Sequence, residues 1–229
     1  MHLGIIPDGN RRFCAERGVG LEELSGIWRS MAEEMLSGLA ALWTGEALSG
    51  HGGEELRALL EVDRYTVYVL STDNLCRSDA SVGAVFAFLD AMLSDGRGSD
   101  SVSMAAGRFL ARFPEGVRLE VVGDTGVLPP AVAEKLRAAR RRCSTGRIVV
   151  TLAIGYDGLR DCEGAYSHDT PPMDAVFRTG RERRLSGFFP LHTMHSELVF
   201  SDKLWPEVTL RDLAAAVEEY RTRERRMGL

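Results

Sequence analysis

The sequence predicts an α/β fold: a single domain over residues 1–229, with a central, mostly parallel six-stranded sheet flanked by helices. Two observations support this prediction. Short runs of β-branched and aromatic residues alternate with longer segments in which apolar residues recur at helical spacing. Strands that alternate with helices are typical of a parallel sheet covered on both faces. The chain has 229 residues, 45% of them hydrophobic, which is enough for one domain with a sizeable core.

Six short apolar runs are expected to form the strands. The first two end in polar turn sequences, Pro7–Asn10 and Ser71–Asn74, and the third ends at Gly123 and Asp124. The predicted strands are His2–Ile6, Tyr65–Leu70, Val117–Val122, Arg147–Ile154, Asp174–Phe177 and Leu198–Phe200. We expect residues 155–173 to be irregular.

The segments between the strands carry helix signals. Pro129 and Pro130 open a helix where the first turn tolerates proline, and Thr209 with Asp212 resembles a helix start. The predicted helices are Leu21–Leu42, Glu54–Leu60, Ala80–Leu93, 101–112, Pro130–Arg142, and a last one from Thr209 to Arg223 or beyond. The Gly-rich stretch 44–53 is expected to be a surface loop.

Charge and cysteine usage narrow the class of protein. A net charge of −5 argues against a nucleic-acid partner, because such proteins present broad basic faces. Basic residues concentrate instead at 137–142, 178–184 and 221–226, a pattern that favours capture of small anions. The four cysteines lie far apart without a C-x-x-C pair, which favours a reduced, cytoplasmic location. The sequence shows no signal peptide and no apolar run that approaches the length of a membrane span.

Polar sequences follow four of the predicted strands, at residues 8–12, 71–77, 155–161 and 178–186. Ligands of parallel sheets bind outside the carboxyl ends of the strands. We therefore expect these four loops to converge on one edge of the sheet. The last of them places four arginines beside a glycine and a serine, and guanidinium forks match the oxygens of phosphate groups. Taken alone, each loop is also compatible with a plain solvated turn.

The first of these loops combines a carboxylate with a site for an anion. Asp8 lies in a glycine turn before an expected helix start, where backbone N–H groups and the helix dipole favour phosphate. Asp8 is a candidate ligand of Mg²⁺, and Asn10, Arg11 and Arg12 are candidates for binding phosphate oxygens. Glu197 is a second carboxylate that can hold Mg²⁺. Together these residues suggest the transfer of a group that leaves from diphosphate.

Other common sites are absent or weak. The sequence has no G-x-x-x-x-G-K-[ST] loop, no G-x-G-x-x-G after a strand, no H-E-x-x-H and no G-x-S-x-G. His192 and His195 lie three apart, but no third metal ligand is evident, so ordinary packing is favoured for this pair. A hydrocarbon substrate needs an apolar cleft. The helices expected at 21–42 and 80–93 can wall one, or they can simply form core.

Several segments, in order along nearly the whole chain, resemble the cis-prenyltransferase family, which includes undecaprenyl diphosphate synthase. They are His2-x-x-x-x-x-Asp8-Gly-Asn10, Ser71-Thr-Asp-Asn74 with Arg77, Arg178-Thr-Gly-x-Glu182-x-Arg184-x-Ser186, Ser196-Glu-Leu198 with Leu204-Trp-Pro206, and Arg223-Glu-Arg-Arg226-x-Gly228. The resemblance implies a homodimer, a sheet with surrounding helices, a hydrophobic cleft, and Mg²⁺-dependent transfer of an allylic group from its diphosphate.

The resemblance also implies a role for each matching residue. Asp8 is the catalytic carboxylate linked to the metal, assisted by Asn74 and Arg77, and Glu197 is a further ligand of Mg²⁺. Arg226 and Gly228 reach the site of the partner subunit. The resemblance implies that Asn10 and Arg12 bind the allylic diphosphate, and that Arg178, Arg184 and Ser186 bind the second diphosphate. Gly9 and Arg11, in the same loop as Asn10 and Arg12, are further expected substrate-binding residues.

Departures from the family pattern indicate a branch within it. Arg11 and Arg181 stand where the family has glycine, and the G-H-x-x-G phosphate motif is replaced by Leu24–Trp28. These features resemble the small secondary-metabolite branch, which joins two dimethylallyl diphosphates irregularly or prenylates aromatic acceptors such as phenazines and carbazoles. We therefore expect dimethylallyl transfer to a second prenyl diphosphate. Two alternatives stay open: an aromatic acceptor, and a non-catalytic partner subunit of a cis-prenyltransferase.

Overall fold

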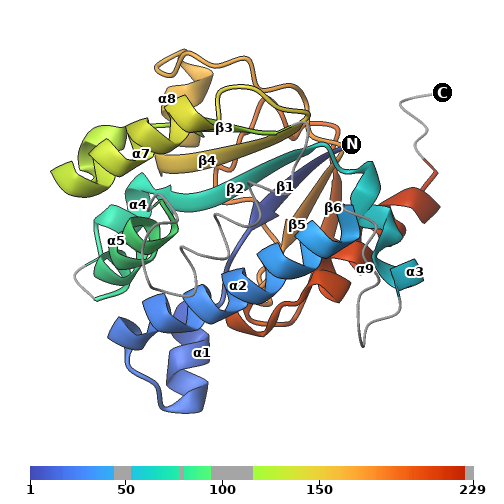
Figure 1. Ribbon diagram of the computed structural model, residues 1–229, viewed down its shortest axis with the longest axis horizontal. Helices are drawn as coiled ribbons and strands as arrows, with labels where there is room; N and C mark the ends of the chain where they lie inside the picture. The colour runs from blue at the N-terminus through green and yellow to red at the C-terminus, as the bar shows by residue number, and fades with distance from the viewer. Residues whose placement is uncertain (44–52, 78–79, 94–115, 225–229) are drawn as a thin grey trace.

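The computed structural model describes residues 1–43, 53–77, 80–93 and 116–224. The helix expected at 101–112, nearly all of the loop expected at 44–53, and the candidate residues Arg226 and Gly228 lie outside these ranges. Within them, the structure consists of six strands and the helices that connect them (Figure 1).

All six strands are parallel and form one sheet in the order β3-β4-β2-β1-β5-β6. The strands are β1 (His2–Ile6), β2 (Arg64–Ser71), β3 (Val117–Val122), β4 (Ile148–Tyr156), β5 (Ala175–Arg178) and β6 (Glu197–Phe200). The six-stranded α/β prediction is confirmed, and the sheet is parallel throughout rather than mostly so. β1 pairs with both β2 and β5, so two segments far apart in sequence flank the first strand.

Most predicted helices form within a few residues of their expected bounds. The structure contains α1 (Asn10–Arg17), α2 (Leu24–Trp43), α3 (Gly53–Leu56), α4 (Thr72–Leu75), α5 (Ser81–Met92), α7 (Pro130–Arg142), α8 (Gly158–Cys162) and α9 (Leu210–Thr222). α9 begins with the predicted capping box, in which the backbone N–H of Thr209 donates to Asp212 at 2.8 Å. The segment 155–173 was expected to be irregular but contains α8, because Asp157 caps a short helical turn.

The two faces of the sheet are covered differently. Residues of α5 and α7 pack on the β3, β4 and β2 side of one face, and α9 packs on β1 and β5 of the same face. The other face carries Tyr156, the last residue of β4, together with Phe188 and Phe189 from the irregular segment between β5 and β6. Among the described helices, the long ones therefore gather on one face, and only that face can enclose a space between helices and strands.

Candidate active site

The centre of the candidate site is an ion pair between the ends of two neighbouring strands. Ile6 of β1 pairs with Arg178 of β5, and Asp8 follows two residues after Ile6. An Nη2 proton of Arg178 is donated to Oδ2 of Asp8 at 2.7 Å. The side chain of Arg178 is 4% exposed, whereas that of Asp8 is 31% exposed. The carboxylate therefore stays accessible to a ligand while the guanidinium is fixed behind it.

The loop after β5 wraps around the guanidinium of Arg178. Its Nη1 donates to the hydroxyl of Ser186 at 2.9 Å and also to the carbonyl oxygen of Arg184. Its Nε is buried and, within the described ranges, no group accepts its proton. A buried donor left unpaired is costly, which favours a ligand that supplies an acceptor.

Two glycines allow the loops after β1 and β5 to touch. A Cβ on Gly180 would lie 2.6 Å from the carbonyl carbon of Asp8, and one on Gly9 would lie 3.0 Å from Cα of Gly180. Both glycines also have positive φ, 101° for Gly9 and 86° for Gly180. Thr179 adds a hydroxyl that donates to the Asp8 carbonyl at 2.7 Å and accepts from the Asp8 N–H at 3.0 Å. Sequence reasoning gave Thr179 no role, yet it holds the two loops in register.

The amino end of helix α1 lies where the loops after β1 and β5 meet. Gly9 is its N-cap, so no side chain caps the first-turn N–H groups, and no acidic residue lies in the first turn. Such an end attracts anions. The side chain of Asn10 is held by its neighbours, because Nδ2 donates to the Pro7 carbonyl and Oδ1 accepts from Trp28 Nε1, each at 2.9 Å. Asn10 thus braces the turn and links it to α2 through Trp28.

Further arginines surround this centre, and a second carboxylate lies among them. Arg12 lies 3.4 Å from Oδ2 of Asp8 and 3.5 Å from Oε1 of Glu182, and Arg184 also bonds to Glu182. Glu182 belongs to the motif that sequence analysis recognised, but no role was predicted for it. Its carboxylate lies between Arg12 and Arg184, and the same position between two guanidinium groups suits the oxygens of an anionic substrate.

Asp8, Arg178 and the predicted residues around them are called the rim below. The remaining predicted residues of this rim line one common cavity. Gly9, Arg11, Asn74 and Arg77 border it together with Asp8 and Arg178. Asn74 is placed by α4, whose N-cap Ser71 accepts the Asn74 N–H at 3.1 Å. The structure therefore brings the predicted residues of the first, second and last loops to one place, as expected from the ends of parallel strands.

The prediction that four loops converge was wrong for the third. Residues 155–161 do not line the cavity. The carboxylate of Asp157 instead accepts the N–H groups of Leu159 and Arg160 and so caps α8. This loop contributes to the rim only indirectly, because the hydroxyl of Thr72 donates to Asp157 at 3.2 Å.

The cavity behind the rim has a volume of about 1490 Å³ and apolar walls. Its walls are α2, α5 and the helix-covered face of the sheet, which confirms the cleft expected between the segments 21–42 and 80–93. Near the rim, Trp28 and Phe88 meet edge to face with ring centroids 5.8 Å apart. The cavity extends to Val117 and Ile148, at the amino ends of β3 and β4.

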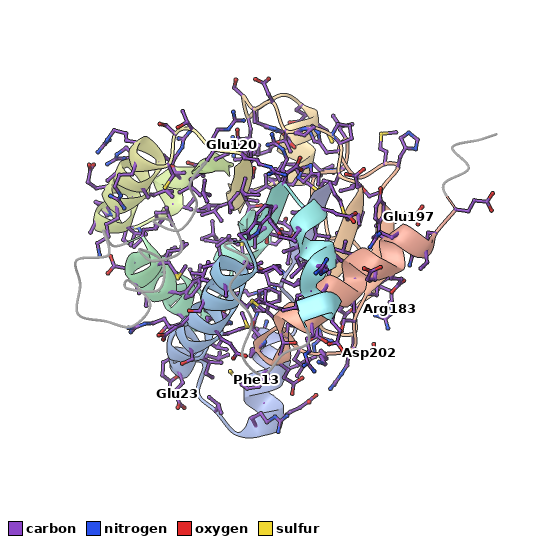
Figure 2. All side chains as sticks on the ribbon, turned by 45° about the vertical axis from the view of Figure 1, so that its right-hand side comes forward. Phe13, Glu23, Glu120, Arg183, Glu197 and Asp202 are labelled. Carbon is purple, nitrogen blue, oxygen red and sulfur yellow. The ribbon has the colours of Figure 1, made fainter. Side chains whose placement is uncertain are left out.

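The structure does not bring Glu197 to Asp8. Glu197 is the first residue of β6 and lies beside Ala175, which pairs with Leu3, whereas Asp8 follows the opposite end of β1. Glu197 is therefore level with Leu3, whereas Asp8 lies beyond Ile6. The rise of β1 from Leu3 to Ile6 alone separates these two positions along the strand by about 10 Å. Glu197 instead pairs with Arg223 at 2.9 Å, and Figure 2 shows it at the opposite end of β6 from Asp202 and Arg183. The expectation that both carboxylates hold one Mg²⁺ within a chain is therefore wrong.

Comparison with known proteins shows the family. The family model described as "Putative undecaprenyl diphosphate synthase" matches residues 54–168 and 162–228. This chain belongs to that prenyltransferase family. It is 32% identical over 244 residues to the tritrans,polycis-undecaprenyl-diphosphate synthase (geranylgeranyl-diphosphate specific) of Aeropyrum pernix, covering 99% of this chain and 97% of that one. It is 29% identical over 251 residues to the isoprenyl transferase of Treponema denticola, covering 99% and 96%.

Solved structures of the cis-prenyltransferase fold share the architecture. Lavandulyl diphosphate synthase from Lavandula x intermedia superposes with a TM-score of 0.75 at 21% identity, over 100% of this chain and 98% of that one. A probable undecaprenyl diphosphate synthase from Campylobacter jejuni gives a TM-score of 0.65 at 22% identity, over 100% and 98%. With the family shown, the chain is an isoprenyl transferase that condenses prenyl diphosphates. Among the described residues, no helix is long and apolar enough to cross a bilayer.

Members of this family generally use Mg²⁺, and the rim fits such an ion. Mg²⁺ is commonly held by one or two carboxylates together with substrate phosphates and water. Asp8 offers a partly exposed carboxylate of that kind, and Arg12, Arg178 and the amino end of α1 surround the space where the phosphates would lie.

Proposed function

We propose that this protein transfers a dimethylallyl group from its diphosphate to a second prenyl diphosphate, with Asp8 holding Mg²⁺, in irregular or short-chain isoprenoid synthesis. The observation that carries the proposal is the cluster of Asp8, Arg178 and Arg12 at the mouth of an apolar cavity. Charged groups at the mouth suit the diphosphates, and the apolar interior suits their hydrocarbon parts. The neighbour lavandulyl diphosphate synthase, whose structure contains dimethylallyl diphosphate, adds support.

The residues of the rim have different roles in the proposed reaction. The C1–O bond of the donor breaks, and the diphosphate leaves with the electron pair. Arg12, Arg77 and the amino end of α1 hold that leaving group, and a Mg²⁺ ion held by Asp8 would neutralise part of its charge. Arg178, Arg184 and Ser186 hold the acceptor's diphosphate, so its double bond faces the allylic carbon. The new carbon–carbon bond forms there, and the adduct then loses a proton. Trp28 and Phe88 exclude water from the allylic carbocation that forms when the C1–O bond breaks.

We further propose that the enzyme is a homodimer in which Glu197 serves the Mg²⁺ of the partner subunit. Glu197 lies too far from Asp8 to act within its own chain. Its partner Arg223 leads directly into the terminal segment with Arg226 and Gly228, which is expected to reach across.

Complementation tests this arrangement. Asp8→Asn and Glu197→Gln chains are co-expressed with different affinity tags, and the mixed dimer is purified. If Glu197 acts across the interface, one site of the mixed dimer carries both substitutions and the other is intact, so about half of the activity returns. If the mixed dimer is as inactive as each parent dimer, Glu197 acts within its own chain and the proposal fails.

The size of the cavity favours a second candidate, the elongation of a longer prenyl chain. The volume of about 1490 Å³ exceeds the ~300–1,000 Å³ of ordinary small-molecule pockets. Both Ser71 and Tyr65 line it, so it follows β2 over about 20 Å. The relative from Aeropyrum pernix carries a name that specifies geranylgeranyl diphosphate.

Product analysis separates these candidates. The purified protein is incubated with Mg²⁺ and labelled dimethylallyl diphosphate alone, then with isopentenyl diphosphate, with geranylgeranyl diphosphate plus isopentenyl diphosphate, and with phenazine- or carbazole-type aromatics. A C10 diphosphate from dimethylallyl diphosphate alone supports the proposal. Products only with isopentenyl diphosphate indicate regular elongation, and products only with an aromatic indicate that acceptor. No turnover in any mixture would leave the non-catalytic partner subunit as the function.

A further inference from the structure

A second group of chemically versatile side chains lies outside the cavity. Asp161 comes from α8, His168 from the loop after it, and His192 from the segment before β6. One ligand atom from each residue lies within 4.8 Å of the other two. None of the three lines the active-site cavity. The group lies beside the aromatic cluster on the face of the sheet opposite that cavity, since Phe189 contacts both histidine rings.

The carboxylate at its centre is buried and shared. Asp161 is 5% exposed, its Oδ2 accepts the hydroxyl proton of Tyr156 at 2.5 Å, and its Oδ1 lies 2.8 Å from Nε2 of His168. The rings of His168 and His192 lie close together, with centroids 5.2 Å apart and planes tilted by 49°. His168 thus bonds directly to the carboxylate, and a ring nitrogen of His192 lies within 4.8 Å of it.

The surroundings hold these side chains in the orientation that a metal requires. The other nitrogen of His168, Nδ1, lies 2.9 Å from the hydroxyl of Thr170. Imidazoles braced by hydroxyl or carbonyl groups, and a carboxylate braced by a second donor, are the arrangement found around bound metal ions.

We propose that Asp161, His168 and His192 form a binding site for a borderline divalent cation of the zinc type. The metal takes the place of the proton between Nε2 of His168 and Oδ1 of Asp161, and that proton is released to solvent. The ligands of a tetrahedral zinc ion at ~2.1 Å lie roughly 3.4 Å apart, so the widest separation of 4.8 Å closes by about 1.4 Å at most. Water completes the fourth position. Two nitrogen ligands exclude Mg²⁺, which prefers oxygen.

Such a metal joins two segments that no long helix supports in the described part of this face. His168 belongs to the loop after α8, whereas His192 belongs to the segment that follows Ser186. Between them, Phe189 stacks on Tyr156 with ring centroids 4.4 Å apart. The bound metal therefore stabilises the segment that presents Ser186 to Arg178, and it takes no part in the transfer reaction itself.

Metal binding is measured with untagged, chelator-treated protein. Co²⁺ is titrated while the visible d–d absorption is followed, and Zn²⁺ is then added in competition. One equivalent of Co²⁺ is expected to give an intense four-coordinate spectrum that Zn²⁺ abolishes and Mg²⁺ does not. His192→Ala is expected to weaken binding by about tenfold or more. The matched control is His195→Ala, which removes an exposed histidine three residues away and is expected to bind like the wild type.

Thermal unfolding provides a second readout. Zn²⁺ is expected to raise the Tm of the wild type and of His195→Ala, but not that of His192→Ala. If His192→Ala does not fold, the near-isosteric Asp161→Asn replaces it. Absence of saturable Co²⁺ binding by the wild type would overturn the proposal. So would unchanged binding by the folded site variant, or loss of binding in Cys162→Ser, which would assign the metal to the exposed thiol next to Asp161.

Discussion

The pair of strands β1 and β5 carries a polar cluster at each end. The two clusters differ in whether they retain an unpaired hydrogen-bonding group and border the cavity. At the carboxyl end, Asp8 and Arg178 form a charged pair that borders the cavity and retains an unpaired buried donor. At the amino end, Nε2 of His2 lies 2.8 Å from the Thr66 hydroxyl, and the His2 N–H donates to Asp174 at 2.7 Å. His2 is 4% exposed and does not line the cavity.

From this difference we expect the carboxyl-end residues to act on substrate and the amino-end residues to stabilise the fold. His2 and Asp8 belong to the same family motif, only six residues apart, yet a strand places them at opposite ends of the sheet. The amino-end cluster pairs its own polar groups, and His2 and Thr66 within it are buried. The carboxyl-end cluster keeps charge and hydrogen-bonding capacity for a ligand. Substitutions at the two ends are therefore expected to change different measured properties.

The largest effect is expected from Asp8→Asn. The variant keeps the shape of the side chain but removes the charge that pairs with Arg178 and that we propose to hold Mg²⁺. Turnover should fall by about 10²–10³-fold or more, as when one electrostatic stabiliser of a transition state is lost. Steady-state rates of diphosphate release measure it.

Asp124→Asn is the matched control for that variant. Asp124 also follows a strand end, that of β3, but it caps a turn by accepting the Gly126 N–H at 2.8 Å and does not line the cavity. Its turnover should stay near that of the wild type. Equal losses in both variants would mean that the carboxyl-end cluster has no special role.

The next largest effect concerns His2 and the pH dependence of stability. Burial, followed by the nearby charge of Arg64, lowers the pKa of His2 from 6.5 to about 4. The unfolded chain therefore binds a proton between pH 6.5 and pH 4 that the folded chain does not. The stability present above pH 6.5 is lost as the pH falls through that window, by about 3 kcal/mol in total.

His2→Gln removes the titrating group while keeping a donor and an acceptor. Urea unfolding between pH 7 and pH 4 should show a flatter loss of stability for this variant than for the wild type, with little change in turnover at neutral pH. Identical slopes for the two proteins would contradict the assignment of this pH dependence to His2.

A smaller effect is expected from Arg178→Lys. Lysine keeps the charge but cannot donate to Asp8, Ser186 and the Arg184 carbonyl at once, because it lacks the planar fork. We expect kcat/KM to fall by about 10–100-fold, with the rise in KM for the acceptor diphosphate as the main cause. Arg183→Lys is the control, since Arg183 is exposed and pairs with Asp202 at 2.6 Å. A similar loss in the control would contradict the role of the fork.

The smallest effect distinguishes two contributions at Ser186. Its φ of 51° is in the left-handed region, and its hydroxyl accepts from Arg178 at 2.9 Å. Ser186→Ala loses the hydrogen bond and keeps the backbone conformation, so it should cost about 1 kcal/mol. Ser186→Gly loses the same bond but relieves the backbone, so it should cost less. Unfolding midpoints measure both, and a greater loss with glycine would contradict this explanation.

The sequence predicted the strands well because each apolar run is bounded by turn residues. It also predicted the convergence of the first, second and last loops, since the ends of parallel strands share one edge. It failed for residues 155–161, where Asp157 caps its own helix instead of facing the cavity. A polar loop after a strand can satisfy the backbone next to it, and composition does not distinguish that use from ligand binding.

The misplacement of Glu197 has a different cause. The predicted strand began at Leu198, so Glu197 already preceded it and belonged to the amino end of a parallel sheet. Strand direction was thus sufficient to separate Glu197 from Asp8. By contrast, nothing local indicated that His192 lies beside His168 and Asp161, because the two segments meet only through the packing of Phe189 and Tyr156.

The ion pair of Asp8 and Arg178 joins residues 170 positions apart in the chain. A ribosome that adds roughly 10 residues per second exposes β1 about 17 s before β5 is made. During that interval the nascent protein contains Asp8 but not yet Arg178, whose guanidinium completes the pair. Substrate and Mg²⁺ can therefore assist only the final stage of folding, after synthesis has passed β5.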